Sequence, residues 1–155
     1  MLADETNGRK QYKKFPMSHQ VTVENREKYL YFKVTGENSP ETIGAYMKDI
    51  VELCRKHDCF RILINECLTG PRLPTMDVFN VASEGAMQLL GQFDAIAYVD
   101  AQMGDMGDFV ESVAVNRGMP LAFFSDIREA EEWIRDRPDG ADEQYIFWKG
   151  PGHDG

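Results

Sequence analysis

The sequence predicts an α/β protein with a mixed, mostly parallel five-stranded sheet and four helices, in the order β-β-α-β-α-β-α-β-α. Three observations support this fold class. Two segments near the N-terminus alternate between apolar and polar residues, as the strands of a hairpin do. The segments that follow alternate between helical apolar spacing and short continuous apolar runs, which is the pattern of β-α-β units. The length of 155 residues fits one domain with its own hydrophobic core.

The hairpin is the first predicted element. Residues 20–24 alternate with period two, four turn-type residues follow, and the alternation resumes over residues 30–35. Two such runs joined by a short polar turn form an antiparallel pair of strands.

The first helix is predicted from its capping signals. Ser39 is suited to the N-cap and Pro40 to the first helical position, and the apolar stripe continues to about His57. A helix of this length can cross over to a parallel strand. That central strand is predicted from Phe60 to Asn65, where the chain is apolar apart from Arg61 and the final Asn65.

Two further strands and three further helices complete the order. In sequence they are a helix over residues 77–90 closed by Gly91, a strand over 94–99, a helix that follows the loop 103–108 and stops at Gly118, a strand over 121–124, and a helix capped by Asp126 that ends before Pro138. Right-handed crossovers between neighbouring strands place the main helices on one face of the sheet.

The other face of the sheet has a mixed character. It carries Lys33, Arg61, Leu63 and Asn65, a set too apolar for free exposure and too polar for a deep core. We expect the chain termini or a second copy of the chain to cover part of it. This expectation is one reason to predict a homodimer.

Three segments are predicted along the chain. Residues 1–17 are expected to form a flexible N-terminal arm, residues 18–137 the α/β domain, and residues 138–155 a tail that docks partly on the domain. The tail contains the apolar patch Tyr145–Trp148, which favours docking on the domain or contact with another chain. A basic cluster in the arm suits either a solvated segment or a contact with an acidic partner.

The composition excludes some classes of partner. The 26 acidic and 17 basic residues give a formal net charge of −9, and such a field repels phosphate backbones and anionic lipid surfaces. We therefore expect no nucleic-acid partner. Because the chain lacks a bilayer-length apolar stretch and a signal-peptide pattern, we expect no membrane span and a cytoplasmic protein.

The candidate functional site lies after the central strand. The loop Glu66–Thr75 is rich in turn residues and opens a helix, and ligands of open α/β sheets bind beyond the carboxyl ends of the strands. The candidate binding residues are Asn65, Glu66, Gly70, Arg72 and Thr75.

A zinc site is not expected from the three cysteines. Cys59 and Cys67 flank the central strand and, at ~3.3 Å per residue, lie roughly 26 Å apart. Cys54 falls on the apolar stripe of the first helix, where a free cysteine behaves as a small hydrophobe. We therefore predict no metal and no cofactor.

The order of elements, the Asn65-Glu66 step and the loop from Gly70 to Thr75 resemble the STAS superfamily, and more closely its SpoIIAA-like branch, also called STAS/SEC14-like. The stretch from Phe123 to Ile134 is similar to the closing motif of that family. In the related anti-sigma-factor antagonists, a partner kinase phosphorylates a Ser or Thr at the start of the second helix. Thr75 is the nearest match by position, although the Asp-Ser-Gly motif is absent and Thr75 also suits a plain helix cap.

Three functions are compatible with these observations. The resemblance and the absence of phosphate-loop, nucleophile-elbow and His-Glu-x-x-His motifs favour a non-catalytic protein-interaction or regulatory module. The SEC14-like relation implies the alternative, a module that binds a small apolar ligand or lipid between helices and sheet. A Mg²⁺-dependent hydrolase or phosphotransferase is the third, because acidic residues follow several strands. These residues are Glu66, Asp100, Asp105, Asp108 and Asp126.

Overall fold

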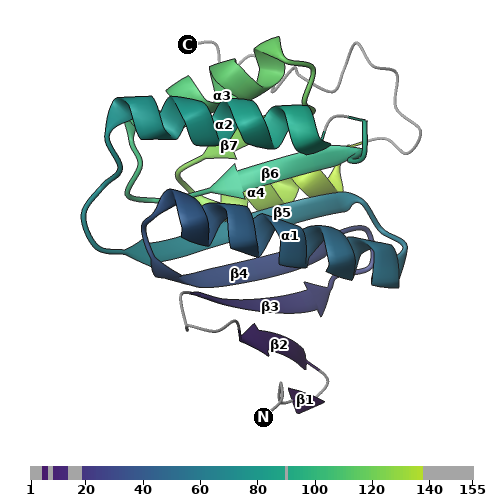
Figure 1. The fold of residues 1–155 in the computed structure, drawn as a ribbon. Helices are drawn as coiled ribbons and strands as arrows, with labels where there is room; N and C mark the ends of the chain where they lie inside the picture. Colours follow the sequence, from purple (N-terminus) through teal and green to yellow (C-terminus); the bar gives the residue numbers. More distant parts are fainter. Residues whose placement is uncertain (1–4, 7–8, 14–18, 90, 138–155) are drawn as a thin grey trace.

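The computed structural model of the protein describes residues 5–6, 9–13, 19–89 and 91–137. These residues form one sheet with the strand order β1-β2-β3-β4-β5-β6-β7 and helices on both faces (Figure 1). The strands are β1 (Glu5–Thr6), β2 (Arg9–Lys13), β3 (His19–Asn25), β4 (Leu30–Glu37), β5 (Arg61–Thr69), β6 (Ala95–Val99) and β7 (Leu121–Phe124). The helices are α1 (Pro40–His57), α2 (Thr75–Leu89), α3 (Asp105–Asn116) and α4 (Ile127–Arg135).

The five strands β3 to β7 and the four helices confirm the predicted fold class and element order. Strands β3 and β4 form the antiparallel hairpin, with Val21 opposite Val34. Strands β4 to β7 run parallel, and Phe32, for example, lies beside Ile64. The mixed sheet therefore has its antiparallel part on one side and its parallel part, with the helical crossovers, on the other.

The N-terminal segment adds two strands that the sequence did not indicate. Strand β2 pairs antiparallel with β3, and β1 pairs antiparallel with β2, so the sheet has seven strands. The segment is polar and lacks a clear apolar alternation, so only its pairing with β3 reveals it. The mobility expected of the arm stays a prediction. The tail over 138–155, with its patch Tyr145–Trp148, lies outside the described residues.

Helix α1 is held at both ends as its sequence predicts. The Ser39 hydroxyl accepts a hydrogen bond from the Thr42 backbone N–H at 3.0 Å, and Pro40 begins the helix. Asp58 ends it in the left-handed conformation, with φ of 54°. His19 and Asp49 also link β3 to α1 through a buried Nε2–Oδ2 contact of 2.7 Å.

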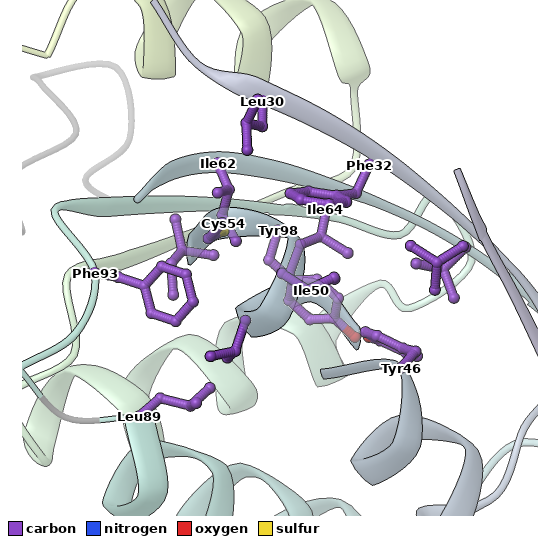
Figure 2. Packing of buried hydrophobic residues seen from close by; sticks show 14 of the residues in the cluster. Leu30, Phe32, Tyr46, Ile50, Cys54, Ile62, Ile64, Leu89, Phe93 and Tyr98 are labelled. Atoms are coloured by element: carbon purple, nitrogen blue, oxygen red, sulfur yellow. The ribbon is translucent and has the colours of Figure 1, made fainter. Parts of the chain in front are cut away.

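The two faces of the sheet carry separate cores. The crossover helices α1, α2 and α3 lie on one face, where the larger core cluster contains Phe32, Ile50 and Ile62 (Figure 2). Helix α4 lies on the opposite face, against β5, β6 and β7. Because α4 follows the last strand, no crossover confines it to the side of the other helices.

The mixed face is therefore covered in part by the last helix of the domain. Ala130 and Ile134 of α4 are fully buried there with Leu63, and the Arg61 guanidinium donates to the Ile134 carbonyl oxygen at 3.4 Å. Lys33, on β4, is exposed on the same face. The expected cover was a chain terminus or a second copy, whereas the structure shows a helix of the domain itself over part of this face.

Helix α3 packs directly on the sheet at Gly107. A Cβ atom added at this glycine would overlap with the ring of Phe123 on β7. A side chain at this position would therefore push the helix away from the sheet. In the part of the chain that the structure describes, we find no helix with the length and apolar character needed to cross a membrane.

Candidate functional site

The central strand is longer than predicted, and this corrects the position of Glu66. Strand β5 continues to Thr69, because residues 66–69 pair in parallel register with residues 34–37 of β4. Glu66 is thus a strand residue and not a loop residue. Neighbouring strand residues point to opposite faces, so Glu66 faces the side of α1 while Asn65 faces the side of α4.

Asn65 belongs to a small polar group on the α4 side. Its side-chain amide donates to the Tyr31 hydroxyl at 2.8 Å, and the Cys67 thiol lies 3.5 Å from its Oδ1 atom. These contacts hold Asn65 in place between two strands. Its side chain therefore lies on the opposite face of the sheet from that of Glu66.

Gly70 and Arg72 lie on the exposed loop before α2, and Thr75 follows this loop at the start of the helix. Gly70 has φ of 100°, a conformation that favours glycine. Arg72 is exposed, and the exposed Thr75 is the first residue of α2. The next residue, Met76, has 65% of its surface exposed. The predicted residues therefore form one exposed loop and two separate positions on β5.

A buried polar cluster surrounds Glu66, which is only 4% exposed. Tyr46 of α1 donates its hydroxyl hydrogen bond to Oε2 of Glu66, and Tyr98 of β6 donates to Oε1 at 3.0 Å. The Glu66 carboxyl group on β5 thus links α1 to β6 through the two tyrosine hydroxyls. We name these three residues the Tyr46–Glu66–Tyr98 cluster.

Burial sets the protonation of this cluster. The pKa of Glu66 is raised from 4.5 to about 8, mainly by burial and also by the neighbouring Asp100, whereas the hydrogen bonds from Tyr46 and Tyr98 act in the opposite direction. Burial also raises the pKa of both tyrosines well above 10. All three groups of the cluster are therefore neutral at neutral pH.

Sequence reasoning identified Glu66 but not its two partners. Tyr46 lies on the apolar stripe of α1, and Tyr98 lies inside a continuously apolar strand, so both resemble ordinary core residues. The available signal was chemical, since a buried tyrosine hydroxyl needs a hydrogen-bond partner. A single buried acid on the central strand supplies that partner to both.

An open cleft of about 600 Å³, lined by both polar and apolar residues, lies beyond the carboxyl ends of β5, β6 and β7. Glu66, Asp100 and Asp126 are among its lining residues, whereas Asp105 and Asp108 are not. Among the described residues, no group of three His, Cys, Asp or Glu side chains has the arrangement of a metal site. The acidic residues singled out in the sequence come together only in part.

An apolar cavity of about 110 Å³ lies on the other side of the cluster, between α2 and the sheet. Helix α2 packs against α1 and α3 but makes few close contacts with the strands beneath it. Figure 2 shows Leu89, at the end of α2, on the far side of the core from the strands. The lining residues are Ile43, Tyr46, Met47, Ile64, Leu73, Val78, Val81, Ala82, Gly85, Leu89, Ile96, Tyr98, Met103, Val110, Ala114, Met119 and Leu121.

The cavity reaches the surface near the carboxyl ends of the strands. Ile43 and Met47 of α1, Leu73 of the loop before α2, and Met103 of the loop after β6 line it and are only partly buried. At its other end Met119 is buried and Leu121 is partly buried. A molecule could therefore enter beside the Gly70–Thr75 loop, at the edge where open α/β sheets bind ligands.

The chain was compared with protein-family models, with curated proteins and with solved structures, and no match was found. The structure shows an α/β fold in which strands β3 to β7 and the four helices have the predicted order. The STAS-like assignment rests on the motifs and element order of the sequence, and it is carried forward as a proposal.

Proposed function

We propose that this protein binds a small apolar molecule in the cavity between α2 and the sheet. The cavity itself carries the proposal, because protein interiors are close-packed and rarely contain voids much larger than a water molecule. An engineered apolar cavity of about 150 Å³ in another protein stays dry and binds benzene. A cavity of about 110 Å³ suits a compact apolar group of similar or slightly smaller size.

The surface of α2 supports the same proposal. Val81, Ala82 and Gly85 point into the cavity, yet they are only half-buried despite their position between two other helices and the sheet. A bound apolar molecule would complete their burial and gain free energy from the apolar area removed from water.

The resemblance to the STAS/SEC14-like family agrees with this location, because it implies an apolar ligand between helices and sheet. In this proposal the chain is a non-catalytic, cytoplasmic module of that type. Its cavity is the working site, and the loop before α2 is the entrance.

Filling the cavity tests the proposal. Ala82→Leu adds three carbon atoms to its wall, and we expect it to abolish the binding of toluene, measured by calorimetry or by the rise in melting temperature. Gln88→Leu is the matched control, since it adds a leucine to an exposed position of the same helix. The proposal is wrong if toluene does not bind, or if it binds equally well to Ala82→Leu.

A protein-interaction module is the second candidate. The observation in its favour is the exposure of Arg72 in the loop and of Thr75 and Met76 at the start of α2. Loss of partner capture by Arg72→Ala or by Thr75→Glu would support docking through this loop. Capture that is unaffected by both substitutions would exclude this surface.

The homodimer is a further part of the second candidate. Native mass spectrometry of the protein purified from its own cells reads its oligomeric state and any phosphate on Thr75 in one measurement. A monomer over the working range of concentration would contradict the dimer.

A further inference from the structure

We infer that the natural ligand of the cavity carries a neutral hydroxyl group, which the hydroxyls of Tyr46 and Tyr98 recognise. The inference rests on the proposed function and specifies the chemical class of the ligand. It concerns a small amphiphile with a compact apolar body and a single neutral hydrogen-bond donor, such as an alcohol or a phenol.

The first step is the placement of polar atoms in the cavity wall. Among the described lining residues, only Tyr46 and Tyr98 carry a hydroxyl, and the other side chains are aliphatic or methionine. The two rings come from α1 and β6 and point toward each other (Figure 2). An otherwise apolar cavity with a few convergent polar groups is the usual form of a small-molecule site, in which the polar groups fix the orientation of the ligand.

The second step is the hydrogen-bonding capacity that the cluster leaves unused. The hydroxyl groups of both tyrosines donate hydrogen bonds to Glu66, and Glu66 is also hydrogen-bonded to Asp100. The donors of both hydroxyls are therefore engaged, whereas each phenolic oxygen keeps the capacity to accept. A group that meets these oxygens from the cavity must supply the proton, so it has to be a donor.

The third step is charge. An anionic head group would lack a donor and would be buried near the carboxyl groups of Glu66 and Asp100, and none of the described residues that line the cavity is basic. A cationic head group would lose its hydration in an apolar enclosure, which is costly for an ammonium ion. A neutral hydroxyl satisfies the free acceptors without either cost.

The experiment compares phenol with toluene, which have a hydroxyl and a methyl group on the same ring, and with benzoate as the anion. Binding is measured by calorimetry at neutral pH to the whole protein and to the variants Tyr46→Phe and Tyr98→Phe. Because phenol has a single O–H proton to donate, we expect at least one of the two variants to weaken phenol binding about fivefold to tenfold, the usual net effect of one hydrogen bond, and both to leave toluene binding unchanged. Benzoate is expected to bind more weakly than phenol to the unmodified protein.

Tyr31→Phe is the matched control, because its hydroxyl bonds to Asn65 on the other side of the sheet. It should leave the ratio of phenol to toluene affinity unchanged. Toluene binding also reports whether the cavity of each variant is intact. If toluene does not bind the unmodified protein, the proposed function fails. If toluene binds but phenol is insensitive to both tyrosine substitutions, or benzoate binds as well as phenol, the inference is overturned while the proposed function stands.

Discussion

Helices α2 and α4 lie on opposite faces of the same sheet and contact it in different ways. The nine residues of α4 bury Ala130, Trp133 and Ile134 directly against the strands. Helix α2 has fifteen residues, yet only Val78 and Leu89 are buried among its described side chains. The longer helix therefore contributes less to the packed core than the shorter one.

We infer that α4 mainly stabilises the fold, whereas α2 mainly serves the proposed binding function. Close-packed contacts such as those of α4 stabilise a fold, whereas helices with few buried contacts open more easily and are the elements that move around ligands. Helix α2 is also the element next to the cavity, the exposed loop and the Tyr46–Glu66–Tyr98 cluster.

The largest expected effect is the pH dependence of stability on the α2 side. The pKa of Glu66 is about 8 in the folded protein and 4.5 in the unfolded chain, so the folded state holds a proton that the unfolded state has lost between these values. The contribution of Glu66 to the free energy of unfolding is therefore largest below about pH 4.5, and it falls by roughly 1.4 kcal/mol per pH unit up to about pH 8.

The measurement is urea unfolding over this pH range for the protein and for Glu66→Gln. The glutamine cannot titrate, so the decline due to Glu66 should disappear in the variant, while other groups contribute equally to both proteins. The same slope in both proteins would show that Glu66 is not buried as a neutral acid.

The next largest effect is the loss of unfolding free energy when a side chain of α4 is shortened, compared with the loss for a side chain of α2. Ile134→Ala removes a fully buried side chain of α4 and should lower the free energy of unfolding by about 2–5 kcal/mol. Val81→Ala removes a half-buried side chain that faces the cavity, so it should cost only about 1 kcal/mol. Equal losses in chemical denaturation would contradict the loose packing of α2.

Local sequence rules predicted how α1 begins and how α2 is closed, because the residues next to a helix end determine how it is capped. Ser39 caps α1, and Gly91 has φ of 81°, the conformation expected where a helix is closed. The same rules stopped the central strand at Asn65, because polar residues follow it, although pairing with β4 carries it on to Thr69. Tertiary pairing thus overrides composition at the end of β5, and it also accounts for β2.

The candidate site shows the same limit more strongly. The sequence placed Glu66 in the loop after the central strand, whereas it lies within β5, and its burial depends on Tyr46 and Tyr98, which are 20 and 32 residues away along the chain. The cavity depends on the distance of α2 from the sheet, which no local pattern encodes. A pattern that is apolar on one helix face is the same for a packed helix and for one that lines a cavity.

A smaller effect is expected where α3 contacts the sheet. Gly107→Ala places a methyl group on the ring of Phe123, and such overpacking typically costs about 1–3 kcal/mol. The loss should appear as a lower midpoint of urea unfolding. An unchanged midpoint would mean that α3, like α2, can move away from its strands.

The smallest expected effect has the opposite sign and concerns Gly85, which lines the cavity on α2. A Cβ atom there meets nothing within 4 Å, and replacing an interior helix glycine by alanine commonly stabilises by about 0.5–1 kcal/mol. Gly44→Ala in α1 is the control, because its Cβ atom also meets nothing within 4 Å and it does not line the cavity. Both variants should raise the melting temperature, but only Gly85→Ala should weaken toluene binding. If Gly85→Ala destabilises the protein as Gly107→Ala does, α2 lies as close to the sheet as α3, and the contrast between packed and loosely packed helices is lost.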